Sequence, residues 1–204
     1  MSALGKVCTG FSKPYVAKYS ASGNTVSYQD GQILARGVEV SIAPESSDPS
    51  KFYANNIEAE VIGGEFTGGT VTLTVDGLLQ DAEALISGTP AADTDGFIKY
   101  GNTTKAPFVG LGFVIRYLSG GTTYYTPVVI RKAVLNPMNT SAATQEEEID
   151  FQTQELEFSM FRDESADADW KWVGGELATE ALAEAAIQTA LGISNGGGST
   201  ASTN

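Results

Sequence analysis

Residues 68–75 read GGTVTLTV, and this stretch decides the class of fold. Val71, Leu73 and Val75 alternate with threonines, so one side of the segment is apolar and the other carries hydroxyl groups. A period of two is typical of a β-strand that covers a hydrophobic core with one face. The two glycines at the start of the stretch permit a turn or a bulge. The stretch therefore predicts a half-buried strand.

The same alternation returns along the chain. Val38, Val40 and Ile42 alternate with Glu39 and Ser41. The segments predicted as strands are residues 14–28 (a pair with a turn at 21–24), 33–42, 57–61, 66–75, 97–100, 108–117, 123–134 and 149–161. Glycine-rich residues 119–121 predict a hairpin between two of them. The expected fold is mainly β, a β-sandwich or a barrel-like domain.

Two segments have helical patterns. Residues 78–87 place their apolar side chains on one face, with Asp76 as a cap at the start and Gly88 at the end. Residues 176–191 are rich in alanine and glutamate, and Gly192 is placed to end that helix. By contrast, residues 44–56 are rich in Pro, Ser, Asp and Asn, which predicts a long loop suited to reach a neighbour.

These patterns divide the chain into four parts. They are an N-terminal arm at residues 1–12, a β domain at 13–175, a C-terminal helix at 176–192 and a Gly/Ser/Thr tail at 193–204. The length of 204 residues fits one such domain with an appendage, or at most two small domains. The arm and the tail lack a core-forming pattern, so we expect both to be disordered in a free copy.

The charge of the chain argues against nucleic-acid binding. The formal net charge is −13, and the 12 Lys and Arg residues are scattered rather than gathered into a basic stripe. Proteins that bind DNA usually carry such a stripe, because it displaces counterions from phosphates. The acidity serves either solubility or a position close to a polyanion without binding to it. Charged residues make up only 18% of the chain, which favours self-association.

The sequence is poor in groups that perform catalysis. It has no histidine, and Cys8 is its single cysteine, so a disulfide framework and histidine-based acid–base chemistry are both excluded. We predict that the protein is not an enzyme and has no catalytic, cofactor-binding or metal site. The first 30 residues show no signal-peptide pattern, and no apolar run approaches the roughly 18 residues that span a bilayer. Synthesis in the cytoplasm is therefore expected.

Two short motifs resemble ligand sites but lack essential parts. Asp93, Asp95 and Gly96 match the middle of a calcium loop, yet the first carboxylate and the terminal glutamate are missing, so we expect an ordinary turn. Gly110 and Gly112 match half of a dinucleotide fingerprint, but no helix pattern follows them. Close packing of the backbone in a strand is the better interpretation of these two glycines.

Acidic clusters and tryptophans leave alternatives open. The run Glu146, Glu147, Glu148 and Asp150 precedes a strand, and its side chains point in alternate directions, which favours a solvated approach to that strand. A second cluster lies at residues 163–169, either as a solvated turn or as a cation site; its acids are Asp163, Glu164, Asp167 and Asp169. Trp170 and Trp172 either pack against the sheet and the last helix or stack on a ligand.

Seven segments in their order and spacing carry a resemblance to a known family. They are residues 14–19 (PYVAKY), 37–45 (GVEVSIAPE), 53–56 (YANN), 68–79 (GGTVTLTVDGLL), 106–113 (APFVGLGF), 149–153 (IDFQT) and 170–172 (WKW). Together they resemble the major tail proteins of long-tailed bacteriophages, the tail tube family of phages and prophages of Gram-positive bacteria. The resemblance covers residues 14–191, and the Ala- and Gly-rich carboxyl end is either an ordinary tail or an added contact element.

The resemblance implies a structural protein of the virion. Such a subunit is a β-sandwich or barrel-like domain with a flanking helix, and six copies extend one sheet into a ring around a channel. Rings stack into a hollow tube through which DNA leaves the capsid without specific binding and without a membrane contact. The implied partners are further copies and other tail proteins: a length-setting scaffold, a terminator, a distal tail protein and chaperones during assembly in the bacterial cytoplasm.

Three expectations follow from that resemblance and from the composition. Many of the surplus acids should face the channel, where they would repel phosphates. The loop at 44–56 and the arm at 1–12 should become ordered when rings stack.

Two other classes of function stay open. A carbohydrate-binding or adhesion β-sandwich needs an exposed aromatic cluster, for which Tyr124 and Tyr125 are candidates, and a carboxylate-based hydrolase needs two converging acids.

Overall fold

The computed structural model describes residues 5–54, 56–90, 92–102, 104–139 and 152–193. The fold is mainly β, as the alternation predicts. The strands are β1 (Val7–Ser22), β2 (Thr25–Ile33), β3 (Gly37–Ser46), β4 (Ser50–Ala54), β5 (Ile57–Ile62), β6 (Phe66–Val75), β7 (Phe108–Ser119), β8 (Thr122–Leu135), β9 (Gln154–Phe161) and β10 (Lys171–Val173). The helices are α1 (Gln80–Ser87) and α2 (Glu180–Ala190).

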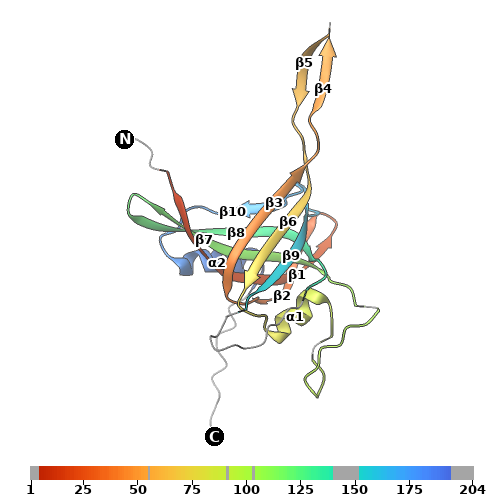
Figure 1. Ribbon diagram of the computed structural model, residues 1–204, viewed down its shortest axis with the longest axis vertical. Helices are drawn as coiled ribbons and strands as arrows, with labels where there is room; N and C mark the ends of the chain where they lie inside the picture. Colours follow the sequence, from red (N-terminus) through yellow and green to blue (C-terminus); the bar gives the residue numbers. More distant parts are fainter. Residues whose placement is uncertain (1–4, 55, 91, 103, 140–151, 194–204) are drawn as a thin grey trace.

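One antiparallel sheet bends back on itself to make two layers. Its strand order is β2-β1-β7-β8-β9-β6-β3, and β10 pairs with β8 beside this path. One edge of β8 pairs with β7, while the other pairs first with β10, at Ile130 and Lys171, and then with β9, at Lys132 and Phe161. The strands β3, β6 and β9 thereby cross over β1, β7 and β8 (Figure 1). We call β3, β6 and β9 the front layer.

The main core lies between these two layers. Val71, Leu73 and Val75 are fully buried, which confirms the prediction from residues 68–75. Across from them, Leu111 and Phe113 of β7 are also fully buried in the same cluster. Burying one such side chain stabilises the fold by about 1.5–3 kcal/mol before entropy is counted. The alternation in β6 thus builds one wall of the core.

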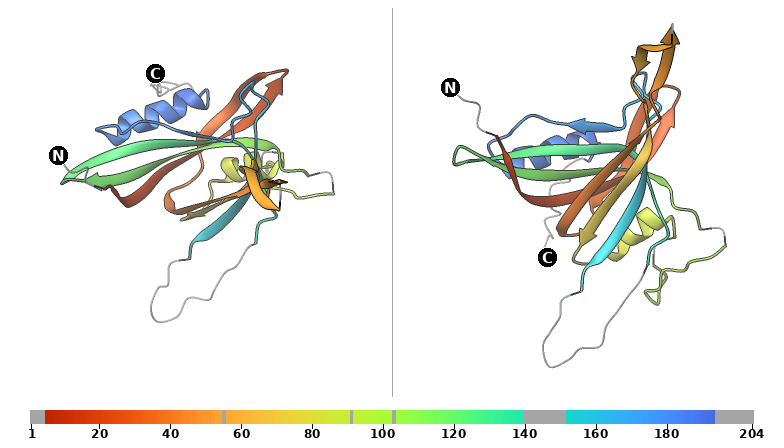
Figure 2. Two further views of the ribbon diagram at one scale, coloured as in Figure 1. Left: turned by 90° about the horizontal axis from the view of Figure 1, so that it is seen from above. Right: turned by 45° about the horizontal axis from the view of Figure 1, so that its top comes forward.

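A second apolar cluster lies on the other side of β1, β7 and β8, where α2 covers the sheet (Figure 2). Because both faces of β7 and β8 are covered, long stretches of these strands are buried without alternation. The helix comes very close at Gly112, where an added Cβ would lie 2.3 Å from the Ile187 side chain. At Gly110 an added Cβ would meet Tyr28 and Leu191. Close packing is therefore confirmed as the role of these two glycines.

The two helices begin later than expected. The N-cap of α1 is Leu79, without a side-chain hydrogen bond, so the prediction that Asp76 caps this helix is wrong. Asp76 instead forms an ion pair with the side chain of Arg36. It also accepts a hydrogen bond from the backbone N–H of Arg36 at 3.0 Å, which connects the end of β6 to the start of β3. Gly88, with a φ of 72°, ends α1 as predicted. Thr179 caps α2 by accepting a hydrogen bond from the N–H of Leu182.

Three expectations about segments differ from the structure. The prediction of a loop at 44–56 is wrong. β3 continues through Ser46, and β4 and β5 pair as a hairpin that projects far from the body (Figure 1). The strand at 97–100 is absent, because that segment finds no partner strand. The arm at 1–12 is a strand from Val7 onward, since its residues pair with β7. Residues 1–4 and the tail at 194–204 lie outside the described residues.

Neither helix of the described chain has the length and apolar character needed to cross a bilayer.

Candidate assembly interface

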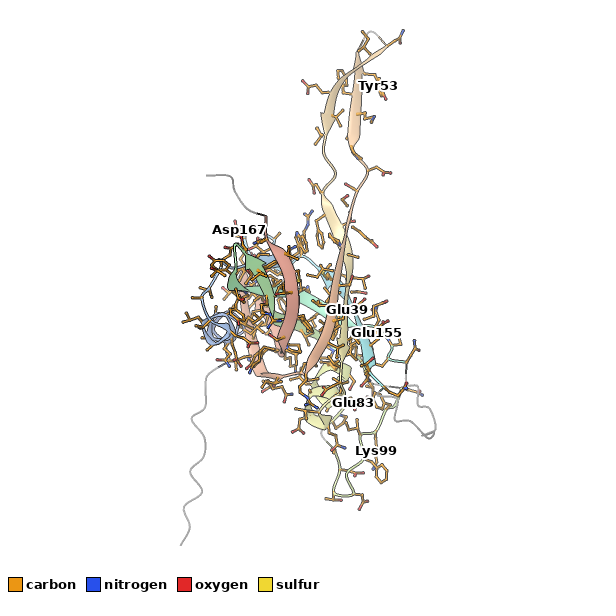
Figure 3. The ribbon with its side chains drawn as sticks, turned by 60° about the vertical axis from the view of Figure 1, so that its left-hand side comes forward. Glu39, Tyr53, Glu83, Lys99, Glu155 and Asp167 are labelled. Atoms are coloured by element: carbon orange, nitrogen blue, oxygen red, sulfur yellow. The ribbon has the colours of Figure 1, made fainter. Side chains whose placement is uncertain are left out.

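The β4–β5 pair, which we call the hairpin, stands clear of the rest of the molecule and carries large apolar side chains (Figure 3). Five of them are exposed: Phe52 at 65%, Tyr53 at 59%, Ile57 at 69%, Val61 at 49% and Ile62 at 70%. An isolated two-stranded hairpin is marginal in water, and exposed apolar patches mark contact surfaces. The hairpin therefore has the composition of a buried element without a cover in its own chain.

The apolar side chains of the hairpin lie on both of its faces. Phe52 stands opposite Glu60, whereas Val61 stands opposite Lys51. Directly opposed residues share a face and neighbours in a strand point to opposite faces, so Phe52 and Val61 lie on different sides. A single flat contact would leave one of these faces in water.

The path of the sheet ends at β2 and β3, and β10 lies beside this path, where it pairs with β8 alone among the described strands. Within the described residues, β2 and β3 each pair with another strand on one side only. Their other edges present backbone N–H and C=O groups that are able to pair with a strand of another chain. Pro44 lies near the end of β3, and proline is tolerated at such an edge because it removes only one donor. These edges and the hairpin are the candidate contact surfaces.

The outer face of the front layer is acidic and rich in hydroxyl groups. Thr72 and Thr74 of β6 lie opposite Glu157 and Glu155 of β9, and Glu39 of β3 lies opposite Thr74 on the other side. These three strands contain four glutamates and neither lysine nor arginine. Figure 3 shows Glu39 and Glu155 close together on this face. The face is therefore anionic.

The turn between β9 and β10 is held by a buried ion pair. The Nε of Arg131 donates to Asp163 at 2.8 Å, and both side chains are almost completely buried. Burial alone would raise the pKa of Asp163, but hydrogen bonds from Ser165 and Arg131 lower it below its usual value. The ring of Trp172 covers the Arg131 guanidinium with 3.6 Å between the charge and the ring centre. Arg131 was not singled out by the sequence, because its burial depends on distant elements.

A second ion pair lies beside the first. Lys132 pairs with Glu164, which also accepts a hydrogen bond from the Tyr19 hydroxyl, and both bonds lower the pKa of Glu164. Burial and the same carboxylate raise the pKa of Tyr19 to about 12. Within the segment 163–169, considered as a cation site, Asp163 and Glu164 are thus already paired with Arg131 and Lys132. Two of the cluster's acids act as anchors for the turn.

The remaining motifs are placed as follows. Asp93 accepts hydrogen bonds from the N–H groups of Asp95 and Phe97, which is the ordinary turn that was expected. Trp170 stacks on Phe66, with ring centres 4.5 Å apart, so it packs on the sheet. Cys8 is exposed on β1. The acidic run at 146–150 lies outside the described residues.

The tyrosine pair named for the aromatic alternative is largely covered. Tyr125 packs against the cluster under α2, and Tyr124 is half-buried, so this pair forms no exposed cluster. Among the described residues no group of three or more Asp, Glu, Cys or His side chains is arranged to hold a metal ion. Phe52 and Tyr53 are neighbouring aromatics that are both exposed, and they lie in the segment that the prolines and serines predicted to be a loop.

No protein-family model matches the chain, and no curated protein matches its sequence.

Proposed function

We propose that this protein is a structural subunit that polymerises as stacked rings into a hollow tube, in the manner of a bacteriophage major tail protein. The observation that carries the proposal is the hairpin, with five large apolar side chains exposed in a single chain. A protein that works alone gains nothing from such an element and risks aggregation. A subunit whose copies cover one another's hairpins gains an interface.

The open sheet edges support ring formation. Pairing of a β2 or β3 edge with a strand of the next copy continues the hydrogen-bonded sheet across the boundary between subunits. Repetition of one such contact closes a ring when the rotation between copies allows it. Six copies per ring is the number that the resemblance implies.

The acidic face of the front layer is the surface that we assign to the channel. Its four glutamates are contributed by β3 and β9, and the strands that form it have no basic residue. Phosphates repel carboxylates, and binding of DNA depends on Lys and Arg that displace counterions. DNA would pass such a wall without being retained.

Electron microscopy of the purified protein tests the proposal as a whole. We expect rings or long hollow tubes in negatively stained concentrated samples, and a growth in mass with concentration by light scattering. A strictly monomeric protein at every protein concentration and ionic strength would overturn the proposal. The replacement Phe52→Ser is the matched variant, because it alters the hairpin and leaves both cores intact.

A carbohydrate-binding or adhesion module is the second candidate, and exposed Phe52 and Tyr53 are the observation in its favour. These neighbours point to opposite faces of β4, so they do not form one flat platform for a sugar ring. Binding of a stable monomer on a glycan array would favour this candidate over the tube subunit.

A further inference from the structure

We infer that the hairpin of one copy docks on a second projection of the next copy, which is built from the start of β1 and the β7–β8 turn. We call this projection the wing and define it as residues 5–13 and 114–126. The inference rests on the proposed function, since it names the surface that covers the hairpin. In Figures 1 and 2 the hairpin and the wing leave the body on different sides, so they do not meet within one chain.

The wing also exposes apolar side chains. Val7 is 65% exposed and Leu118 is 41% exposed. They stand directly opposite each other in the β1–β7 pairing, so they share one face and form a single apolar step. As at the hairpin, no described residue of the same chain covers these two side chains. Both projections therefore expose apolar side chains that another copy could cover.

The charges of the two projections are complementary. The hairpin with its stems, residues 45–65, carries five acids and one lysine. The wing carries Lys6, Lys13 and Arg116 and no acid, although the chain as a whole has a net charge of −13. Opposite charges at the rim of an apolar contact steer association and set its register. Three acids contact the wing: Glu176 pairs with Lys6, Glu184 pairs with Lys13, and Glu180 accepts a hydrogen bond from Ser12. The attraction for an acidic hairpin is therefore concentrated at Arg116, whereas two hairpins repel each other.

Arg116 is the cation best placed to receive the hairpin. Lys6 and Lys13 are already paired with Glu176 and Glu184 near α2. The guanidinium of Arg116 donates to the hydroxyl and carbonyl oxygens of Thr9 at 3.3 and 3.1 Å, which holds it on the exposed wing. A carboxylate of an incoming hairpin would add a charged partner to this fixed cation.

Cross-linking of the full-length protein tests the contact, because the single native cysteine lies in the wing. Cys8 is exposed, and the variant Glu60→Cys adds one thiol on the hairpin. In assembled material a short bismaleimide should join copies into a ladder of covalent oligomers on a denaturing gel. The variant Asp95→Cys, in the exposed loop before β7, is the matched control and should give no ladder.

The outcomes separate the inference from the proposed function. A ladder in Glu60→Cys, together with the loss of every covalent oligomer, dimers included, when Cys8→Ser is added, supports hairpin-to-wing docking. With Cys8→Ser each copy carries a single thiol, so a covalent dimer that still forms shows hairpin-to-hairpin contact and overturns the inference. Oligomers without a ladder overturn the inference alone, whereas the absence of oligomers overturns it together with the proposed function.

Charge reversal provides a second readout. Arg116→Glu and Glu60→Lys should each raise the concentration needed for assembly roughly tenfold, by placing like charges across the contact. The double variant should recover most of that loss. Failure of the double variant to recover assembly, with the circular dichroism spectrum unchanged, would count against a pairing of these projections.

Discussion

The strand pair β7–β8 and the hairpin β4–β5 are both apolar on two faces, but only the first is covered within the chain. The front layer lies on one face of β7 and β8, and α2 lies on the other. The hairpin has five large apolar side chains in water. The same pattern of side chains therefore builds a core in one place and leaves an exposed apolar surface in another, which we assign to contact with a further copy.

The largest expected effect separates a core phenylalanine from a hairpin phenylalanine. Phe158→Ala removes a fully buried ring and should lower the free energy of unfolding by about 3–5 kcal/mol. Phe52→Ala should change it by less than about 0.5 kcal/mol, because the ring is already in water. Urea unfolding of monomeric samples measures both. An equal loss in the two variants would break the comparison.

The next effect concerns the cover that α2 provides. Ile187→Ala should lower the free energy of unfolding by about 2–4 kcal/mol, since Ile187 is fully buried against β7. Leu182→Ala is the control on the same helix, because Leu182 is 55% exposed. Its cost should stay below about 1 kcal/mol. If both variants were equally stable, α2 would not be the cover that we describe.

A smaller effect is expected from acid. The pKa values of Asp163 and Glu164 are lower in the folded protein than their ordinary values. Their contribution to stability is therefore complete above pH 5 and is lost as the pH falls through about 4 and below. Thermal unfolding as a function of pH should show this loss. The variant Glu164→Gln should flatten it, whereas Glu39→Gln should leave the curve unchanged.

The smallest effect on folding is expected at the acidic face. Glu155→Lys should change the free energy of unfolding by less than about 0.5 kcal/mol, because the side chain is exposed. Tubes of this variant should retain DNA at low salt and release it as salt is raised, while tubes with Glu155→Gln should not retain it. Unchanged DNA behaviour in the lysine variant would contradict the assignment of this face to the channel.

Much of the fold could be predicted from local patterns. Alternation located β6, the strands predicted at 108–117 and 123–134 are β7 and β8, and the left-handed conformation available to glycine located the end of α1 at Gly88. The hairpin was missed because Pro44 and Pro49 indicated a loop, although a proline at a sheet edge does not interrupt the pairing on the other side. The role of Arg131 depends on contacts with residues far along the chain, which no local pattern reports.

The acids of the hairpin have a consequence for the time between synthesis and assembly. Glu58 and Glu60 alternate with Ile57, Ala59 and Val61 in the sequence of β5. Charges that interrupt an apolar strand act as gatekeepers against amyloid-like stacking, because identical ribbons laid side by side would bring like charges together. Under the proposed function, these charges would keep newly made copies apart until assembly.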